Sequence, residues 1–350
     1  MNNTNKIKYL NNFLELEKFL NSYSKLYSNI LIFTQRNILE KTNLKSSINF
    51  GQLGIKVFLL DNSEKAKSIF TFDEAIDYLV KNKFGRASLI IGLGGGIVTD
   101  LSGFVASCYM RGIHHIFIPT SLLGIVDASI GGKTAINYLD KRNIIGTFKQ
   151  AEQVLVIPEF LKFLNKKEII NGFAEILKYG LILDKKLFDF IELHFMNLIN
   201  NANSKDMLKI IKTCINLKAN IVNQDFRDDG IRNILNFGHT IGHAIEMNSN
   251  YHIAHGEAVF YGMKAASYIS MKDNHLSLNE YNRIIKFLKI IPIDWNISFD
   301  CNKIYNSMQH DKKIKQNKIS FILLDKIGKA YMNNKVPASL VKESIDSILI

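Results

Sequence analysis

The sequence has few cysteines, and its three thiols lie far apart. Cys108, Cys214 and Cys301 form no Cys-x-x-Cys pair within the 350 residues. This spacing disfavours a disulfide framework or a cysteine zinc site, and it is typical of proteins in the reducing cytosol. We therefore expect a cytoplasmic protein.

Long hydrophobic runs are also missing. The chain has no stretch of about 18 or more apolar residues, so we expect no membrane span and no membrane partner. Its first residues, MNNTNKIKYL, lack the apolar core of a signal peptide. Hydrophobic residues nevertheless make up 47% of the chain and charged residues 22%, which is typical of a globular protein with a real core.

The chain is basic but has no long basic tract. Its 44 basic and 32 acidic residues give a formal net charge of +12, with the lysines spread along the whole chain. A basic balance suits nucleic acid, an anionic membrane surface or a small anionic substrate. The even spread favours the last of these, and we expect no nucleic-acid partner.

The first part of the chain alternates predicted strands and helices. Apolar runs predict strands, and helical spacing of apolar residues predicts helices. The predicted strands are 29–34, 55–60, 87–96 and 114–120, and the predicted helices are 72–82 and 98–110. This alternation predicts a parallel α/β sheet with right-handed crossovers.

The second part changes character after VLVIPEF, residues 154–160. Nearly everything from 161 to 300 has helical periodicity, and a β-like stretch at 318–324 precedes a terminal helix. We therefore predict an α/β domain over 1–157 and a mainly helical domain over 158–350.

A glycine-rich turn, GLGGGIVTD at 92–100, lies between a predicted strand and a predicted helix. Glycines there let the backbone approach a phosphate, although they also occur in tight turns without a ligand. The spacing is not the GxGxxG fingerprint, because position 97 is Ile. Asp100, placed in the first helical turn, either interacts with the helix dipole or accepts a hydrogen bond from a cofactor.

A second polar cluster occupies IPTSLLGIVDASIGGKTAIN, residues 118–137. The Gly-Gly-Lys-Thr run resembles a P-loop, but Asp127 stands where that motif needs its first glycine. Lys133 after two glycines still suits an anionic oxygen, and Lys141, Arg142 and Asn143 are expected in a following loop. Solvated surface loops remain the alternative interpretation.

The helical half carries the residues that suit a metal. Zinc binds imidazole nitrogen and carboxylate oxygen, and a catalytic site leaves one position open. The candidate ligands are Glu175, His239, His243, His252 and His255. His239 and His243 lie on one helix face, and spacing alone leaves open whether both of them bind. FGHTIGH is not HExxH, which disfavours a peptidase.

Several long motifs occur together and in order along the chain. They are GGGIVTDLSGFVAS, IPTSLLGIVDASIGGKTAIN, NIIGTF, GFAEILKYG, DDGIRNILNFGHTIGHAIE and HGEAV. Together they resemble the 3-dehydroquinate synthase family of sugar-phosphate cyclases, from about residue 88 to 265. The resemblance implies a Rossmann-like NAD domain, a helical metal domain, an active site in the cleft between them, and a homodimer.

The resemblance also implies roles for individual residues. Zn²⁺, with Co²⁺ as an alternative, would be held by Glu175, His239 and His255, while His243 would act on the substrate. Contacts with NAD⁺ would come from Glu64, Lys67, Gly94, Gly95, Gly96, Asp100, Thr120, Ser121, Arg142, Asn143 and Phe160. Substrate contacts would come from Asp127, Lys133, Lys178, Lys218, Arg232, Asn236 and Lys312, with Arg111 reaching the phosphate in the neighbouring subunit.

The implied reaction converts 3-deoxy-D-arabino-heptulosonate 7-phosphate to 3-dehydroquinate and phosphate. Oxidation by NAD⁺, assisted by a Lewis-acid metal, acidifies the adjacent C–H, so that phosphate can leave by elimination. Lys133 and Arg111 would neutralise the phosphate charge. NADH then returns the hydride, and ring opening with an aldol step closes the carbocycle.

The chain departs from the family pattern at several positions. Arg142 stands where Lys is usual, Asp228 replaces a Glu, Ser121 replaces a Thr, and Phe163 lies where Thr-Leu-Pro is common. These changes leave room for a cyclase on another sugar phosphate, such as a 2-deoxy-scyllo-inosose or valiolone-type synthase. A metal- and NAD-dependent polyol dehydrogenase, or a catalytically dead or nucleic-acid-binding relative, is a further alternative.

Overall fold

The computed structural model describes residues 6–139, 141–250, 252–296, 300–308 and 319–348. It has two compact units. One consists of Met1–Ile169 and Ala202–Arg227, and the other of Ile170–Asn201 and Asp228–Ile350. The division into functional domains at 157/158 stays a prediction.

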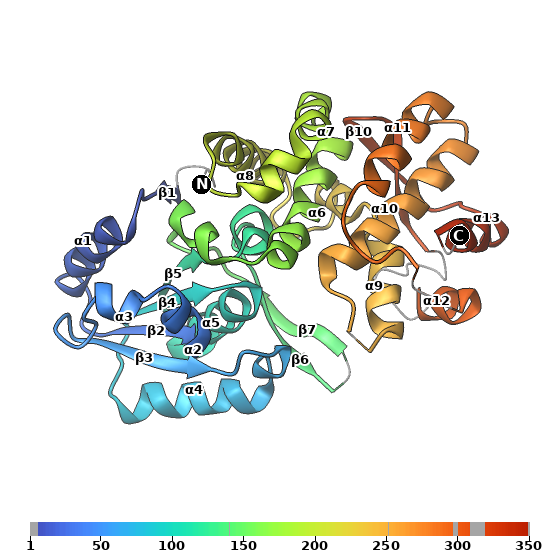
Figure 1. Cartoon of the computed structure of the whole chain (residues 1–350). Coiled ribbons are helices and arrows are strands. Elements are labelled where there is room, and N and C mark those ends of the chain that lie inside the picture. The colour runs from blue at the N-terminus through green and yellow to red at the C-terminus, as the bar shows by residue number, and fades with distance from the viewer. Residues whose placement is uncertain (1–5, 140, 251, 297–299, 309–318, 349–350) are drawn as a thin grey trace. The chain divides into compact units, whose positions relative to one another are not determined.

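A six-stranded parallel sheet forms the centre of the first unit (Figure 1). Its strand order is β1-β8-β5-β4-β2-β3, and every neighbouring pair runs parallel. The strands are β1 (Ile7–Tyr9), β2 (Ile30–Gln35), β3 (Ile55–Leu60), β4 (Leu89–Gly94), β5 (His114–Pro119) and β8 (Gln153–Val156). The predicted α/β fold with a parallel sheet is therefore confirmed.

Helices cover both faces of this sheet, and alternate residues of β2, β3 and β4 pack into different cores. On β2, Ile30 and Ile32 join one core, whereas Leu31 and Phe33 join the other. The first core lies against α1 (Phe13–Ser24), α2 (Arg36–Lys41) and α3 (Leu44–Ser47). The second lies against α4 (Ile69–Lys81) and α5 (Gly96–Cys108). Burial on both faces explains why these strands read as continuous apolar runs.

An antiparallel hairpin extends from the sheet-forming part of this unit (Figure 1). It consists of β6 (Lys133–Tyr138) and β7 (Lys141–Phe148). The prediction of a loop containing Lys141, Arg142 and Asn143 is therefore wrong, because these residues begin β7. Exposed and half-buried positions dominate β7, so its apolar pattern is too weak to reveal a strand.

Helices dominate the second unit. They are α6 (Lys166–Ile182, which starts in the first unit), α7 (Lys185–Asn200), α9 (His239–Asn248), α10 (His255–Lys272), α11 (Leu278–Lys289), α12 (Cys301–Met308) and α13 (Ala338–Ile348). The helix α10 contacts α9, α11, α13 and the strand β9 (Phe321–Lys326), which pairs with β10 (Lys329–Asn333). The helix α8 (Lys205–Gln224) belongs to the first unit. The predicted helical second half is confirmed.

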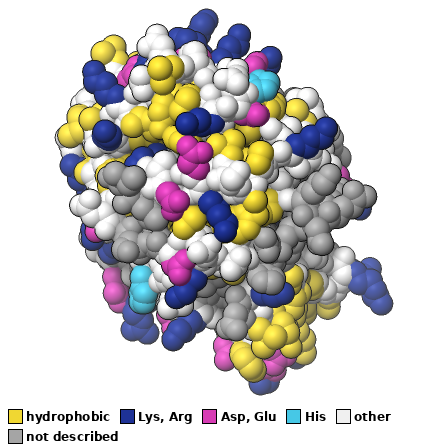
Figure 2. Space-filling view, turned by 90° about the vertical axis from the view of Figure 1, so that its right-hand side faces the viewer, with side chains coloured by type: hydrophobic (Ala, Val, Ile, Leu, Met, Phe, Trp, Pro, Cys, Tyr) yellow, Lys and Arg dark blue, Asp and Glu magenta, His cyan; other side chains and the backbone are white. Residues whose placement is uncertain are grey.

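The surface of the described residues carries charges of both signs. Figure 2 shows lysine and arginine side chains scattered among acidic ones over one face. Among the described helices, none is both long and apolar enough to cross a membrane.

Candidate functional site

Four residues expected to contact a nucleotide meet in one polar network in the first unit. The Lys67 ammonium, which is buried, donates to Asp100 Oδ2 at 2.7 Å and to Asn143 Oδ1 at 2.5 Å. Glu64 Oε1 lies 3.6 Å from the same ammonium and accepts from the Asn137 amide at 2.9 Å. Asn137 in turn accepts from the Asn143 backbone N–H at 2.9 Å. The network therefore joins the end of β3, the helix α5 and the β6–β7 hairpin.

Opposed effects set the charges in this network. Burial raises the pKa of Asp100, although Lys67 acts in the opposite direction. Burial lowers the pKa of Lys67, but Asp100 and Glu64 outweigh that effect and raise it overall. Asp100 is the fifth residue of α5, so its predicted place in the first turn is wrong, and its carboxylate is used by Lys67 instead.

The glycine-rich turn lies at the carboxyl edge of the sheet. Gly94 ends β4 and Gly96 begins α5, while Thr120 directly follows β5 and donates its N–H to the Gly94 carbonyl at 3.1 Å. A Cβ on Gly94 would lie 2.4 Å from Val98 Cγ2 of α5. Only glycine at this position therefore lets α5 begin so soon after the end of β4. Ligands of open parallel sheets bind beyond this edge.

Two other residues expected to contact the cofactor, Arg142 and Phe160, also belong to the first unit. Arg142 is the second residue of β7, next to Asn143 in the polar network. The ring of Phe160 is 1% exposed and packs 4.8 Å from the ring of Phe13. A cofactor contact from Phe160 would thus have to come from its backbone.

Asp127 and Lys218 are brought together although they are far apart in sequence. Asp127 lies in a single π-helical turn, Gly124–Ala128, which packs against α8. Lys218 on α8 donates to the Asp127 backbone oxygen at 2.7 Å and to its Oδ1 at 2.6 Å. This buried ammonium is held in a fixed position.

Lys133 is presented by a turn that requires glycine. Gly131 and Gly132 have φ values of 107° and 68°, a region that other residues rarely adopt. A Cβ on Gly132 would lie 2.9 Å from the ring of Phe226. The exposed Lys133 side chain lies at the start of β6, and its ammonium suits an anionic ligand.

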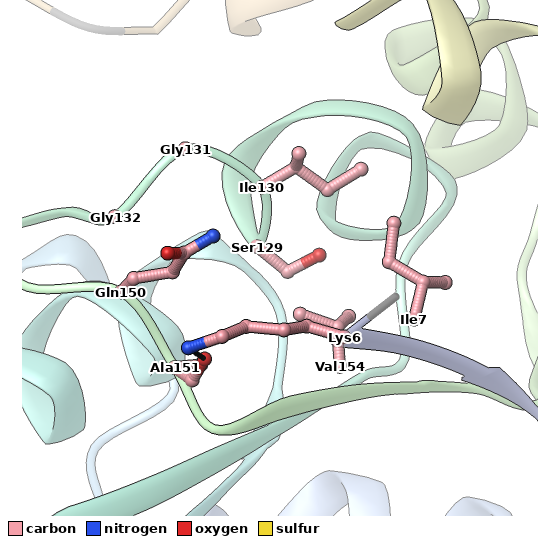
Figure 3. Close-up of a pocket in the computed structure, with 9 residues that line it drawn as sticks. All are labelled: Lys6, Ile7, Ser129, Ile130, Gly131, Gly132, Gln150, Ala151 and Val154. Carbon is pink, nitrogen blue, oxygen red and sulfur yellow. Dashed lines mark hydrogen bonds between the residues drawn. The ribbon is translucent and has the colours of Figure 1, made fainter. Parts of the chain in front are cut away.

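A small pocket adjoins this turn, and Figure 3 shows the residues that line it. The Lys6 ammonium crosses it and donates to the Ala151 backbone oxygen at 3.2 Å. The Lys149 backbone N–H donates to the Gly132 carbonyl at 2.8 Å. The segment after β7 is thereby hydrogen-bonded to the Gly131–Gly132 turn.

Arg111 lies in an unusual backbone segment after α5. Met110, Arg111 and Gly112 have φ values of 50°, 66° and 113°, three positive values in succession. Such conformations cost roughly 1–3 kcal/mol each for residues with a Cβ and are common at functional sites. The Arg111 side chain is exposed.

The predicted metal ligands converge in the second unit. Glu175 Oε1 lies 3.4 Å from His239 Nε2 and 3.6 Å from His255 Nε2. One candidate ligand atom from each of these residues lies within 4.8 Å of the others. Glu175 is on α6, His239 starts α9 and His255 starts α10. His255 is thus the first residue of its helix, rather than part of the preceding loop.

Close contacts between backbones make this convergence possible. A Cβ on Gly262 of α10 would lie 1.8 Å from the Gly238 carbonyl oxygen, just before α9. A Cβ on Gly256 would lie 2.1 Å from the Asn171 carbonyl oxygen of α6, and the Gly256 N–H donates to Asn171 Oδ1 at 2.6 Å. These glycines allow the three ligand-bearing helices to approach one another.

The donor set fits a zinc ion. Bonds of about 2.0–2.2 Å at tetrahedral angles would place neighbouring ligand atoms about 3.3–3.6 Å apart, as the two Glu175 distances are. Glu175 is fully buried, and its Oε1 accepts no hydrogen bond from the described residues. A buried carboxylate oxygen without a donor is costly unless a cation satisfies it.

The protonation of these groups is set by burial and by their neighbours. Burial alone would raise the pKa of Glu175, but Lys178 and His239 hold it well below its usual value. Burial and then Lys178 lower the pKa of His239, which favours the neutral imidazole that metals bind. Burial opposes protonation of His255, yet the neighbouring carboxylates of Glu175 and Glu246 raise its pKa to about 10.

His243 lies beside the metal ligands but outside their group. Its ring centroid is 5.2 Å from that of His239 and 6.0 Å from that of His255. Among the described residues it belongs to a second metal-capable group, with Glu246 and His255. His252 is exposed and belongs to neither group.

Three other predicted substrate contacts of this unit lie on α6 or just before α9: Lys178, Arg232 and Asn236. Arg232 is buried and Asn236 ends the same 3₁₀ segment, Ile231–Asn236, which precedes α9. Lys178 is buried on α6 and forms an ion pair with Glu175. Lys312 lies outside the described residues.

Sequence reasoning missed two polar residues that support the ligands. Asn171 precedes Glu175 by four residues on α6, and its side chain accepts from the start of α10. Glu246 follows His239 by seven residues on α9, and its Oε2 lies 3.3 Å from His255 Nδ1. Helical spacing places Asn171 on the same helix face as Glu175, and Glu246 on the same face as His239. That spacing is the sequence signal that could have found both residues.

Models of known protein families match most of the chain. Residues 57–171 match the family described as 3-dehydroquinate synthase N-terminal, and residues 172–314 match the family described as 3-dehydroquinate synthase C-terminal. A 3-dehydroquinate synthase of Clostridium tetani is 41% identical over 83% of this chain and 78% of that protein.

Solved structures share the fold. ValA, a 2-epi-5-epi-valiolone synthase of Streptomyces hygroscopicus subsp. jinggangensis 5008 with NAD⁺ and Zn²⁺ bound, has a TM-score of 0.86 at 24% identity, covering 98% of this chain and 96% of that one. A 2-deoxy-scyllo-inosose synthase with carbaglucose-6-phosphate, NAD⁺ and Co²⁺ has a TM-score of 0.84 at 24% identity, covering 97% and 96%. The sequence matches extend over most of the chain at higher identity, and the chain therefore belongs to the 3-dehydroquinate synthase family, a family of carbon–oxygen lyases.

Proposed function

We propose that this chain converts 3-deoxy-D-arabino-heptulosonate 7-phosphate to 3-dehydroquinate and phosphate with bound NAD⁺ and Zn²⁺. The observation that carries the proposal is the convergence of Glu175, His239 and His255, with ligand spacings that suit a tetrahedral metal. Co²⁺ has the same ligand preferences and is an alternative occupant.

The two cofactors would supply chemistry that side chains lack. When bound, zinc would act as a Lewis acid toward substrate hydroxyls, and NAD⁺ would take up a hydride and return it. Zinc would be held by Glu175, His239 and His255. NAD⁺ would be held by the Lys67–Asp100–Asn143 network with Glu64 and Arg142, and by the turn Gly94, Gly95, Gly96 with Thr120, Ser121 and the Phe160 backbone.

Buried cations would bind the anionic ends of the substrate. Lys178, buried beside Glu175, would hold a substrate oxygen next to the metal ligands. Arg232 would pair with the carboxylate, since a guanidinium matches that group with two parallel hydrogen bonds, and Asn236 would donate to a hydroxyl. Lys218, which Asp127 holds in position, would donate to a substrate hydroxyl.

Phosphate elimination needs charge neutralisation and a proton acceptor. Lys133, on its rigid glycine turn, would bind the phosphate oxygens and stabilise the charge that develops as the group leaves. The phosphate itself would take the proton from the neighbouring carbon. His243 would move a proton at a substrate hydroxyl, since it lies one helical turn from His239 without joining its ligand group.

We also propose that the chain acts as a homodimer in which Arg111 reaches the phosphate bound by the partner subunit. The support is the run of positive φ values at Met110–Gly112, a segment that carries an exposed arginine at a cost in backbone energy.

Phosphate release tests the proposed reaction. Purified protein is incubated with the heptulosonate phosphate and NAD⁺, with and without a chelator. We expect stoichiometric phosphate and 3-dehydroquinate, no accumulation of NADH, and loss of activity after chelation. No release from protein with both cofactors bound would contradict the proposal. Turnover of another sugar phosphate instead would favour the other cyclases, and net NADH formation would favour a dehydrogenase.

A further inference from the structure

Glu246 lies at the second nitrogen of a proposed metal ligand. It occupies the third turn of α9, seven residues after His239, and only 4% of its surface is exposed. Its Oε2 lies 3.3 Å from His255 Nδ1, while His255 Nε2 lies 3.6 Å from Glu175 Oε1. The two ring nitrogens of His255 therefore face two different carboxylates.

The acceptors that the structure places at the His255 ring nitrogens are carboxylates. It is the first residue of α10, the preceding Ala254 supplies no capping side chain, and 27% of the His255 side chain is exposed. A neutral imidazole carries its hydrogen on one nitrogen only, and the nitrogen that lacks it binds a metal. The partner of Nδ1 therefore decides whether Nε2 is available.

The neighbouring ligand provides a comparison. His239 Nδ1 lies 3.0 Å from the Phe237 backbone oxygen, which can only accept a hydrogen bond. This contact fixes the hydrogen on Nδ1 and leaves Nε2 of His239 to face Glu175. For His255 the corresponding acceptor comes from a side chain on another helix, and it is a carboxylate.

We propose that Glu246 is a positioning residue that accepts a hydrogen bond from His255 Nδ1–H and so directs Nε2 to the metal. The inference rests on the proposed metal site. Partners of this kind orient ligating imidazoles and increase their basicity, and their removal typically lowers metal affinity about 10–100-fold.

The same residues allow a competing arrangement, which stoichiometry can separate. His243, Glu246 and His255 also form a metal-capable group, in which His255 would bind through Nδ1. In that arrangement Glu246 would be a direct ligand of a second ion. Our proposal requires one zinc per chain, bound through His255 Nε2.

Zinc affinity of Glu246→Gln and Glu246→Ala tests the proposal without using activity. Metal-free proteins are titrated with zinc against a chromophoric chelator. We expect Glu246→Ala to bind about 10–100-fold more weakly, and Glu246→Gln to retain most of the affinity, because its amide oxygen still accepts from Nδ1–H. Asn248→Ala is the matched control, since Asn248 lies on α9 and contacts Ala244 and Ser307 instead. Circular dichroism establishes that each variant is folded.

The tautomer of His255 gives a second readout on unaltered protein. Long-range ¹H–¹⁵N spectra of the zinc-bound chain should show hydrogen on Nδ1 of His255. Hydrogen on Nε2, two zinc ions per wild-type chain, or wild-type affinity in Glu246→Ala would each overturn the proposal. A Gln variant as weak as the Ala variant would do so as well. Wild-type protein that binds no zinc would contradict the proposed metal site and remove this inference with it.

Discussion

At the scale of single residues, the sequence indicated which side chains carry chemistry but not how they divide their roles. The spacing of His239 and His243 placed both on one helix face, and either or both could bind a metal on that ground. The structure groups His239 with Glu175 and His255, and it groups His243 with Glu246 and His255. That division depends on which helix lies opposite each ring, and local spacing holds no information on it.

This grouping predicts different outcomes for two adjacent alanine variants. His239→Ala should lose bound zinc, because it removes one of three ligands. His243→Ala should keep zinc near wild-type content but lose about a hundredfold or more in turnover, as expected for a proton-transfer group. Metal analysis of the purified proteins checks the first point and phosphate release the second. Loss of zinc in both variants would contradict the assigned roles.

A buried histidine outside the site should make stability depend on pH. His115 on β5 is fully buried, its ring packs against Phe117, and neither ring nitrogen has a hydrogen-bond partner among the described residues. Burial, and then the charges of Lys149 and Lys6, lower its pKa to about 3. The contribution of uncharged His115 to the free energy of unfolding is therefore complete above the unfolded-state pKa of about 6.5, and it declines as the pH falls toward 3.

The variant His115→Phe isolates this contribution. Below about pH 6.5 the wild type should lose about 1.4 kcal/mol of unfolding free energy per pH unit more than the variant, because only the wild type takes up this proton on unfolding. Urea denaturation at several pH values between 4 and 7 measures the difference, with the other titrating groups common to both proteins. Parallel pH profiles would refute the assignment.

At the scale of elements, the sequence predicted strands with two buried faces and long amphipathic helices well. The runs that became β2 and β4 are mostly apolar because buried cores lie on both sides of these strands. The β6–β7 hairpin was missed, since its exposed positions give no clear alternation. Asp100 was misplaced because the helix α5 begins two residues earlier, at a glycine.

The packing of α9 on α10 predicts a strict requirement for glycine at position 262. A Cβ there would lie 1.8 Å from the Gly238 carbonyl oxygen, so Gly262→Ala must separate the two helices. We expect a loss of more than about 3 kcal/mol in stability, together with weaker zinc binding. Gly85→Ala is the control, because nothing lies within 4 Å of its added Cβ. Chemical denaturation compares the unfolding midpoints of the Gly262→Ala and Gly85→Ala variants. Similar midpoints would contradict the prediction, because they would show that α9 and α10 can separate without loss of stability.

At the scale of the whole molecule, the motif order identified the family, and the matches over residues 57–314 agree with it. The basic balance suits a substrate with carboxylate and phosphate groups. Features that depend on a second copy of the chain could not be derived from residue patterns. The role of Arg111 is of that kind, and it stays a proposal.

Mixing two inactive variants tests that role. Arg111→Ala and His239→Ala are refolded together, so that about half of the dimers contain one subunit of each kind. If Arg111 acts on the partner's site, each mixed dimer regains one complete site, and activity should reach about a quarter of the wild-type value. Each variant refolded alone is the control. No recovery in verified mixed dimers would place Arg111 in its own subunit's site.

The most direct test of the account is the X-ray absorption spectrum of the zinc-loaded protein at the zinc edge. The account predicts one zinc per chain bound by two imidazoles, one carboxylate and one further light-atom ligand, and the same number of imidazoles in zinc-loaded His243→Ala. A wild-type spectrum with three imidazoles, or with sulfur ligands, would contradict a centre built from Glu175, His239 and His255.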